Sequence, residues 1–174
     1  MLVYIITMKK TKLYLIVENI RSAHNVGSLL RSAEGLGVSE VALCGYTPYP
    51  KKDNDERLPY LAEKINNRIR KTALGAEFKQ RWRYFKDSQQ AIGYYRDKGI
   101  QIVSLEQTNN AKQITKFKVS GDIALVVGNE IEGVKHDTIM ASDSVIYIPM
   151  KGEKESFNVT IAASMALFYL TLMV

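Results

Sequence analysis

The sequence contains very few residues that bind transition metals or form disulfides. Cys44 is the only cysteine in 174 residues, and His24 and His136 are the only histidines. A single cysteine excludes an intramolecular disulfide framework and a cysteine-rich zinc module. Two histidines leave little for a histidine-ligated metal site. We therefore expect neither a disulfide scaffold nor a metal cofactor.

The sequence also lacks a segment that is long and apolar enough to span a membrane. The uncharged run at residues 159–174 has 16 residues and contains Thr160, Ser164 and Thr171. A bilayer span needs about 20 apolar residues, so this run predicts a helix buried in the core or in a subunit interface. Residues 1–11 do not have the pattern of a signal peptide, because their charges follow the apolar stretch. We expect a cytoplasmic protein without a membrane partner, whose residues 1–11 are an extension, disordered or from an upstream start.

The positive charge is concentrated in one segment. The chain has a net charge of +6, and residues 51–86 carry 11 basic and 5 acidic residues, which accounts for all of it. Cations with interleaved aromatic rings are typical of nucleic-acid binding, so we take Arg68, Arg70 and Arg81 as candidate contacts. The alternative is a solvated helix face followed by a strand whose aromatics point inward. The aromatic residues of this segment are Tyr60, Phe78, Trp82, Tyr84 and Phe85.

Short apolar runs alternate along the chain with segments of helical periodicity. Strands are predicted at residues 12–18, 40–44, 81–85, 100–105, 122–127 and 145–149. Helices are predicted at residues 25–36, 58–73, 87–98, 135–141 and 158–173. The strands are almost continuously apolar, which indicates burial on both faces and a mostly parallel α/β sheet flanked by helices. No linker interrupts the pattern, so residues 12–174 are predicted to form one domain.

Small polar residues and glycines follow several predicted strands. Ligands of parallel α/β sheets bind beyond the carboxyl ends of the strands, so residues 19–27, 106–107, 128–133 and 149–158 are the segments to consider. None of them carries a phosphate-binding loop, a dinucleotide fingerprint or a nucleophile elbow. The residue pattern alone therefore favours an α/β protein with a polar-ligand site and a basic flank.

Three of these segments, in order along the chain, resemble the motifs of one family. Residues 19–38 (NIRSAHNVGSLLRSAEGLGV) resemble motif 1 of the SpoU, or TrmH-like, RNA methyltransferases, a branch of the SPOUT superfamily. Residues 124–134 (ALVVGNEIEGV) are similar to motif 2, and residues 146–163 (IYIPMKGEKESFNVTIAA) to motif 3. The linking stretch at residues 71–77 (KTALGAE) is also similar, and the resemblance extends over about residues 12–170.

The resemblance implies a fold, a cofactor and a reaction. The fold is an α/β sheet whose C-terminal part forms a deep trefoil knot, which general rules of chain topology do not predict. The cofactor is S-adenosyl-L-methionine, and the reaction is methyl transfer to a ribose 2′-hydroxyl of tRNA or rRNA. The active unit is a homodimer with the site near the subunit interface. The alternative is an RNA-binding relative without catalytic activity.

The resemblance also assigns residues to the cofactor. These residues contact it largely through backbone groups. Phe157 stands where the family usually has leucine, which leaves backbone contacts intact but changes the shape of the pocket. The assigned residues are Leu105, Gly128, Asn129, Ile148, Met150 and Phe157.

Catalytic roles are assigned in the same way to Asn25, Arg31, Glu130, Ser156 and Asn158. The family picture makes Arg31 the base, but a guanidinium with a pKa above about 12 normally stays protonated. Arg31 could instead bind the RNA phosphate and stabilise the developing oxyanion. Each residue also has a structural alternative: Arg31 as a solvated side chain, Asn158 as a helix N-cap, Glu130 as a pairing partner of a loop or second subunit, and Ser156 as a loop hydroxyl.

Overall fold

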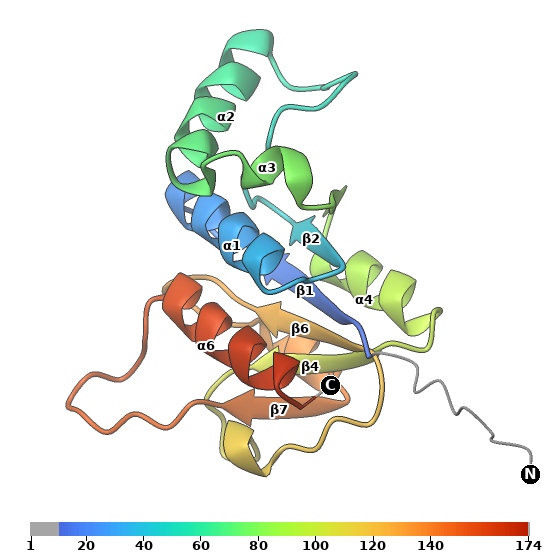
Figure 1. The fold of residues 1–174 in the computed structure, drawn as a ribbon, viewed down its shortest axis with the longest axis vertical. Coiled ribbons are helices and arrows are strands. Elements are labelled where there is room, and N and C mark those ends of the chain that lie inside the picture. The colour runs from blue at the N-terminus through green and yellow to red at the C-terminus, as the bar shows by residue number, and fades with distance from the viewer. Residues whose placement is uncertain (1–10, 174) are drawn as a thin grey trace, which may run out of the picture.

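The computed structural model describes residues 11–173, which form a parallel sheet flanked by helices (Figure 1). Its strands are β1 (Leu13–Glu18), β2 (Glu40–Cys44), β3 (Trp82–Phe85), β4 (Gln101–Leu105), β5 (Lys112–Gln113), β6 (Ile123–Val127) and β7 (Ser144–Tyr147). Within the described residues, the seven strands lie in the order β3-β2-β1-β6-β4-β7-β5. All of their pairings are parallel, which confirms the predicted sheet.

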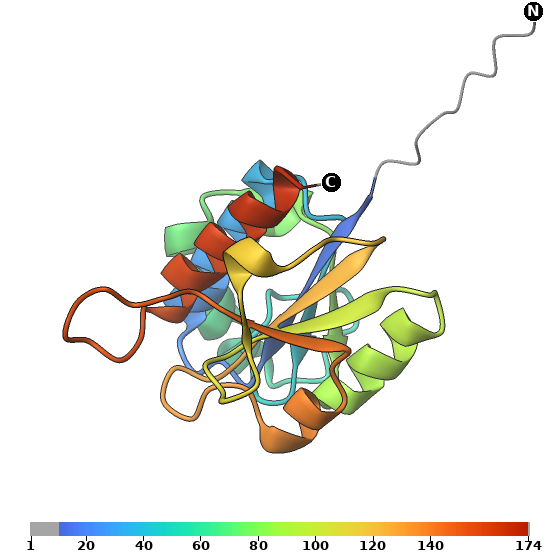
Figure 2. The same ribbon diagram turned by 90° about the horizontal axis from the view of Figure 1, so that it is seen from below.

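Helices cover both faces of the sheet. The helices are α1 (Ala23–Gly35), α2 (Pro59–Ala73), α3 (Ala76–Lys79), α4 (Ser88–Arg96), α5 (His136–Met140) and α6 (Val159–Thr171), with a 3-10 turn η1 (Ile114–Lys116). α1 and α6 lie side by side on one face, and α2 and α3 pack against α1 (Figure 1). α4 and α5 cover the opposite face (Figure 2).

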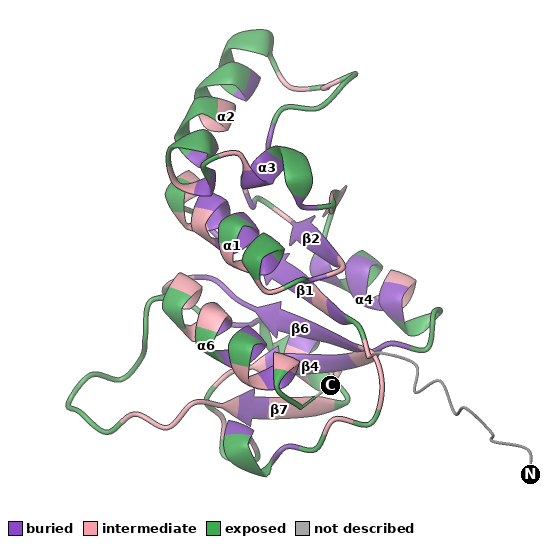
Figure 3. Ribbon diagram, viewed as in Figure 1, coloured by how far each residue is buried: buried purple, intermediate pink, exposed green. Residues whose placement is uncertain are grey.

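The strand residues alternate between two hydrophobic clusters, one for each face. In β1, Leu13, Leu15 and Val17 pack with α1 and α6, whereas Ile16 packs with α4. The central strands are therefore buried on both sides (Figure 3), as their continuous apolar sequence predicts. Cys44, at the end of β2, is fully buried in the second cluster, and burial raises the pKa of its thiol.

A buried carboxylate at the end of β1 anchors α4 and α5. Glu18 is 1% exposed and accepts hydrogen bonds from the hydroxyl of Thr138 at 2.7 Å and from the backbone N–H of Lys135 at 2.9 Å. The hydroxyl of Ser88, at the start of α4, also donates to it. Buried carboxylates are tolerated where such donors satisfy their oxygens, so Glu18 fixes these helices at the carboxyl edge of the sheet.

The predicted helices and strands are present, with small shifts at their ends. α1 begins at Ala23, earlier than predicted, because Ser22 is its N-cap and accepts the N–H of Asn25 at 3.3 Å. α3, β5 and η1 are absent from the sequence-based prediction, because elements this short show no periodicity. Among residues 11–173, no helix has the length and apolar character needed to cross a membrane. The domain limits 1–11 and 12–174 stay predictions, because residues 1–10 and Val174 lie outside the described residues.

Candidate active site

A cavity of about 410 Å³ opens at the carboxyl ends of β4, β6 and β7. Segments that are far apart in the sequence converge on it: the ends of these strands, the turn after β6, and the loop that leads into α6. The six residues predicted to contact the cofactor all line this cavity, namely Leu105, Gly128, Asn129, Ile148, Met150 and Phe157. Three of the predicted catalytic residues line it as well, namely Glu130, Ser156 and Asn158.

The turn after β6 brings its own backbone into very close contact. Asn129 and Gly133 exchange backbone hydrogen bonds of 2.9 and 3.0 Å. A Cβ atom on Gly128 would lie 2.2 Å from the backbone of Gly133 and Val134. Gly133 itself has a φ of +70°, the left-handed region that favours glycine. Gly128 and Gly133 therefore permit a wall of bare backbone on this side of the cavity.

The side chain of Asn129 is used inside the protein. Its Oδ1 accepts the backbone N–H groups of Ile131 at 2.8 Å and Glu132 at 3.0 Å. Its Nδ2 donates to the carbonyl of Asn19 at 2.8 Å and to the hydroxyl of Tyr46 at 2.9 Å. Because both ends of this amide are satisfied, we expect Asn129 to offer a ligand its backbone rather than its side chain.

Glu130 connects the turn after β6 to the segment before α1. Its carboxylate accepts the backbone N–H groups of Arg21 at 3.0 Å and Ser22 at 3.1 Å, and the amide Nδ2 of Asn25 at 2.8 Å. Burial raises the pKa of this carboxyl, but the hydrogen bonds together outweigh it and hold the pKa below its ordinary value. The structure thus shows the loop-pairing role that was one of the two expectations for Glu130.

Glu106, immediately after β4, lies in a segment that the sequence marked for ligand binding, but the sequence assigned it no role. Its Oε2 accepts the N–H of Val134 at 2.8 Å, and its Oε1 accepts the N–H of Gln107 at 2.9 Å. Glu106 lines the cavity and fixes the far end of the turn after β6. A carboxylate directly after a strand was the available signal, but its partner lies elsewhere in the sequence.

The loop before α6 presents exposed side chains to the cavity. Ser156 is exposed, and Phe157 keeps 39% of its surface accessible. Asn158 is the N-cap of α6, and its Oδ1 accepts the N–H of Thr160 at 2.9 Å. The capping alternative for Asn158 is therefore correct, and it leaves the Nδ2 group of the amide able to contact a ligand.

Comparison with known proteins identifies the family. Residues 12–168 match the SpoU rRNA Methylase family. The chain belongs to this SpoU family. The family resemblance noted from the three motifs is thereby confirmed.

Two curated relatives illustrate the range of the SpoU family. The chain is 27% identical over 157 residues to the 23S rRNA (guanosine-2′-O-)-methyltransferase RlmB of Acinetobacter baylyi, covering 90% of this chain and 58% of the relative. It is 24% identical over 155 residues to the tRNA (guanosine(18)-2′-O)-methyltransferase of Escherichia coli, covering 87% of this chain and 59% of the relative. The chain thus spans less than two thirds of the length of these relatives.

Solved structures of SpoU proteins share the fold. AviRb from Streptomyces viridochromogenes gives a TM-score of 0.78 at 19% identity, covering 94% of this chain and 60% of that protein. The AdoMet-bound rRNA methyltransferase from Sinorhizobium meliloti gives 0.77 at 21% identity, covering 92% of this chain and 56% of that protein. These similarities confirm the predicted α/β fold, and the likeness to SpoU structures implies the knotted fold of the SPOUT class.

The two predicted catalytic residues of SpoU motif 1 lie outside the cavity lining. Asn25 contacts the site only through Glu130, to which it donates a hydrogen bond. Arg31 is exposed on α1 and is not among the residues that line the cavity. Next to it, the hydroxyl of Ser164 in α6 donates to that of Ser32 at 2.8 Å, so Arg31 lies close to the boundary between α1 and α6.

The basic segment of this SpoU chain divides into paired and unpaired positions. Arg70 lies 3.6 Å from the buried carboxylate of Glu77 and stacks on Phe78. Arg81 is exposed just before β3, and Arg68 lines a groove beside α2. The predicted RNA contacts therefore do not lie in one shared pocket. The aromatics also divide: those of β3 are half-buried, as the inward-facing alternative predicts, and Tyr60 and Phe78 are exposed.

Metal ligands do not gather at this site or elsewhere in the described chain. Among residues 11–173, no cluster of three or more His, Cys, Asp or Glu side chains could hold a metal ion.

Proposed function

We propose that this chain catalyses S-adenosyl-L-methionine-dependent methylation of a ribose 2′-hydroxyl in tRNA or rRNA. The observation that carries the proposal is the convergence of the six predicted cofactor positions on one cavity, in a chain of the SpoU family. The relatives named above act on guanosine in rRNA or tRNA, which favours a guanosine nucleotide as the target. The expected cytoplasmic location stays a prediction.

The cavity has the size and chemistry to hold the cofactor. Its volume of about 410 Å³ falls within the usual range for small-molecule sites. Gly128, Gly133 and Glu106 all line it, and a Cβ atom at either glycine would collide with the turn itself or with the Glu106 carboxylate, so this wall keeps its shape only with glycine at both positions. S-adenosylmethionine carries an electrophilic methyl group on a cationic sulfonium, for which bare backbone and nearby carboxylates are suitable surroundings.

The residues of the chain then align and activate the acceptor hydroxyl. In-line transfer needs the ribose oxygen aligned with the methyl group and relieved of its proton. We assign to the Arg31 guanidinium the binding of the adjacent phosphate and the stabilisation of negative charge on the ribose oxygen, whose proton passes to solvent water as the methyl group is transferred. Asn25 and Glu130 are positioning residues that hold the segment before α1. Ser156 and Asn158 line the cavity, where they can contact the ribose.

We propose a homodimer, which would bring Arg31 to a cavity that it does not line in the single chain. The exposed face of α6 carries a stripe of large apolar side chains at helical spacing, Ile161, Met165, Phe168 and Leu172. A helix that is apolar all round normally has both faces covered. A second copy seated on this stripe also meets the adjacent face of α1. Arg31 would then lie at the subunit boundary, beside a cavity.

Titration of the purified chain with S-adenosylmethionine by isothermal calorimetry tests the proposal first. We expect saturable binding, and absence of binding would exclude the enzyme. Binding of RNA without the cofactor would instead support the non-catalytic alternative. Mapping 2′-O-methyl sites in RNA from cells with and without the gene then identifies the target.

The Arg31→Ala variant tests the assigned mechanism. We expect it to abolish turnover while cofactor affinity stays within about twofold of the original, because Arg31 does not line the cofactor cavity. Arg31→Lys serves as the conservative control and should retain partial phosphate binding but lose the planar guanidinium. Unchanged turnover in Arg31→Ala would contradict the role.

A further inference from the structure

A second depression, the α2 groove, lies between the segment that leads into α1 and helix α2. It has a volume of about 390 Å³, and three of its lining residues are the basic side chains Arg21, Lys64 and Arg68. No carboxylate is among the described residues that line it. The groove therefore gathers positive charge from the basic segment, residues 51–86, and from the segment before α1.

The cations of the α2 groove are not neutralised inside the described part of the protein. Two neighbouring cations, in contrast, do have acidic partners. Lys51 pairs with Glu63 at 3.2 Å, and Arg70 lies 3.6 Å from Glu77. Among residues 11–173, no ion pair forms with Arg21, Lys64 or Arg68. Arginine and lysine side chains gathered around a depression without internal counter-charges are suited to bind phosphate groups.

The remaining walls of the α2 groove are apolar. Pro48, Leu61 and Ile65 line it, and Leu61 is 43% exposed. Aliphatic walls beside phosphate-binding cations match the two parts of a nucleotide, its base and its backbone, through apolar contact and charge. The groove thus resembles a site for a nucleic-acid strand more than a site for an inorganic anion.

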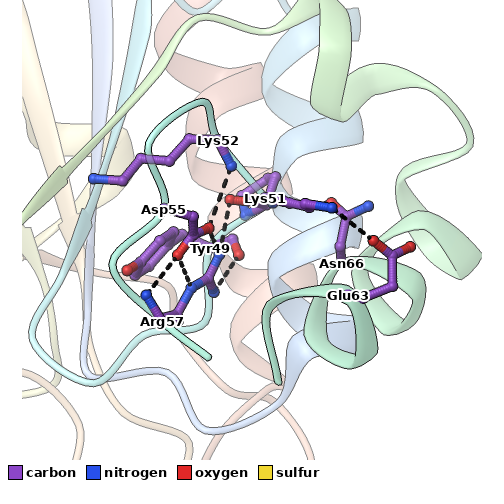
Figure 4. A network of polar contacts seen from close by, with 8 residues as sticks. Tyr49, Lys51, Lys52, Asp55, Arg57, Glu63 and Asn66 are labelled. Atoms are coloured by element: carbon purple, nitrogen blue, oxygen red, sulfur yellow. Dashed lines mark hydrogen bonds and ion pairs between the residues drawn. The ribbon is translucent and has the colours of Figure 1, made fainter. Parts of the chain in front are cut away.

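The loop that contributes Pro48 is held rigid before any ligand arrives (Figure 4). The guanidinium of Arg57 donates to the carbonyl of Tyr49 at 3.0 Å and to Asp55 at 2.8 Å, and it stacks 3.7 Å from the ring of Tyr49. The backbone N–H of Lys51 donates to Asn66 of α2 at 3.0 Å. Pro48 therefore belongs to a wall that is already fixed against α2, which lowers the entropic cost of binding.

The α2 groove and the cavity share the segment that precedes α1. Arg21 and Ser22 line the groove, while their backbone N–H groups donate to Glu130, which lines the cavity. A strand whose ribose enters the cavity would therefore place its next nucleotide near the groove.

We propose that the α2 groove binds a single-stranded RNA nucleotide adjacent to the methylated one. The phosphates lie against Arg21, Lys64 and Arg68, and the base lies on Leu61 and Ile65. This inference rests on the proposed function for the identity of the strand as RNA. It adds a second contact that selects for unpaired RNA next to the target ribose.

The test compares two triple variants of the full chain that each remove three positive charges. The first is Arg21→Gln, Lys64→Gln and Arg68→Gln. The matched control is Lys112→Gln, Lys116→Gln and Lys118→Gln, all exposed side chains around η1, at the opposite end of the molecule from α2 (Figure 1). The probe is a fluorescein-labelled single-stranded RNA of about twelve nucleotides, measured by fluorescence anisotropy over a range of salt concentrations.

The groove variant should bind the RNA at least about tenfold more weakly near 0.1 M salt. The plot of log binding constant against log salt concentration should become less steep by about 2, since each lost phosphate contact with a single strand removes about 0.7. The control should change the slope by less than about 0.5. Equal slopes for the two variants would overturn the proposal.

Cofactor titration separates this proposal from the proposed function. Both variants should bind S-adenosylmethionine as the original chain does, since none of the altered residues lines the cavity. If the original chain binds RNA through the groove but does not bind the cofactor, the proposed methyltransferase function is wrong, whereas RNA binding in the groove is supported. If the original chain methylates RNA but the groove variant binds RNA as tightly as the original chain does, the proposed function stands and the groove proposal fails.

Discussion

At the scale of single residues, Glu130 links the two loops that carry most of the predicted catalytic groups. Its carboxylate accepts hydrogen bonds from Arg21, Ser22 and Asn25, and its pKa lies below the ordinary value of 4.5. A carboxyl with a lowered pKa stabilises the folded state above its ordinary pKa and loses this contribution as the pH falls through the folded value. The loop before α1 should therefore be acid-sensitive.

The Glu130→Gln variant should be less stable at pH 7 by about 1–2 kcal/mol, because an amide cannot accept at both of its ends. The unfolding free energy of the variant should also fall less than that of the original chain when the pH is lowered from 6 to below about 4.5, because the variant has no carboxylate to protonate at this position. Urea unfolding at several pH values measures both effects. Glu132→Gln, an exposed neighbour in the same turn, is the control and should change neither.

The turn after β6 leaves no space for a side chain at Gly128. The Gly128→Ala variant places a Cβ within 2.2 Å of backbone atoms of Gly133 and Val134, so the turn must open. We expect cofactor affinity to fall by about tenfold or more, measured by calorimetry, with a loss of stability of about 1–3 kcal/mol. Gly121→Ala is the control, because nothing lies within 4 Å of its added Cβ. Equal affinity in both variants would contradict the backbone-wall interpretation.

Sequence reasoning identified glycines and strand ends better than the contacts between them. Gly128 and Ile148 follow apolar strands, and the family motifs placed them in the site. Neither Glu106 nor Tyr46 was given a role, because each acts through a partner distant in the sequence, Val134 and Asn129 respectively. Only the fold shows which loops meet.

At the scale of elements, the segment between β2 and α2 is ordered by one arginine rather than by regular structure. Arg57 bonds Asp55 and the carbonyl of Tyr49, and it holds the pKa of Asp55 well below its usual range. By the same sign argument as for Glu130, the stabilising contribution of Asp55 persists above its ordinary pKa and disappears only in strong acid.

Replacing Arg57 by alanine should loosen this segment while leaving the sheet intact. We expect backbone amides of residues 46–58 to exchange at least about tenfold faster, measured by hydrogen–deuterium exchange mass spectrometry. RNA affinity should also fall, because Pro48 would no longer be held in the wall of the α2 groove. Arg96→Ala, whose arginine lies on α4 away from this loop, is the comparison and should leave these amides unchanged. Unchanged exchange in Arg57→Ala would show that the rest of the loop suffices.

The regular elements were predictable because each carries a complete pattern. β1 and β6 are continuously apolar because both of their faces are buried, and α1 has a clear apolar stripe. α3 and β5 were not predictable, since their few residues take their conformation from the neighbours on which they pack.

At the scale of the whole molecule, α6 is the element with the most extended apolar surface left exposed in the single chain. Its stripe of Ile161, Met165, Phe168 and Leu172 is accessible in the single chain. The uncharged C-terminal run predicts either a core helix or an interface helix; one face of α6 packs in the core, and the interface stays a prediction for the other face.

The Phe168→Glu variant tests the homodimer. Placing a charge in the centre of the stripe should convert a dimer to a monomer, measured by light scattering after size-exclusion chromatography, and should abolish turnover if Arg31 acts at the subunit boundary. Phe78→Glu, at an even more exposed aromatic on α3, is the control and should leave the mass unchanged. A monomeric original chain, or a variant that remains dimeric, would exclude this interface.

Hydrophobic patterning predicted that the strands form a parallel sheet, but it did not predict their order in the sheet. The knot came from the family resemblance alone, since threading of the chain leaves no mark on local periodicity.

The deep placement of Cys44 has a practical consequence for future experiments. The only sulfhydryl in the chain is fully enclosed and resists ionisation, so maleimide dyes should not react with it while the protein is folded. A cysteine introduced at the rim of the α2 groove would then be labelled alone. Fluorescence transfer from that position to a tagged RNA could follow substrate docking in real time without first removing a native thiol.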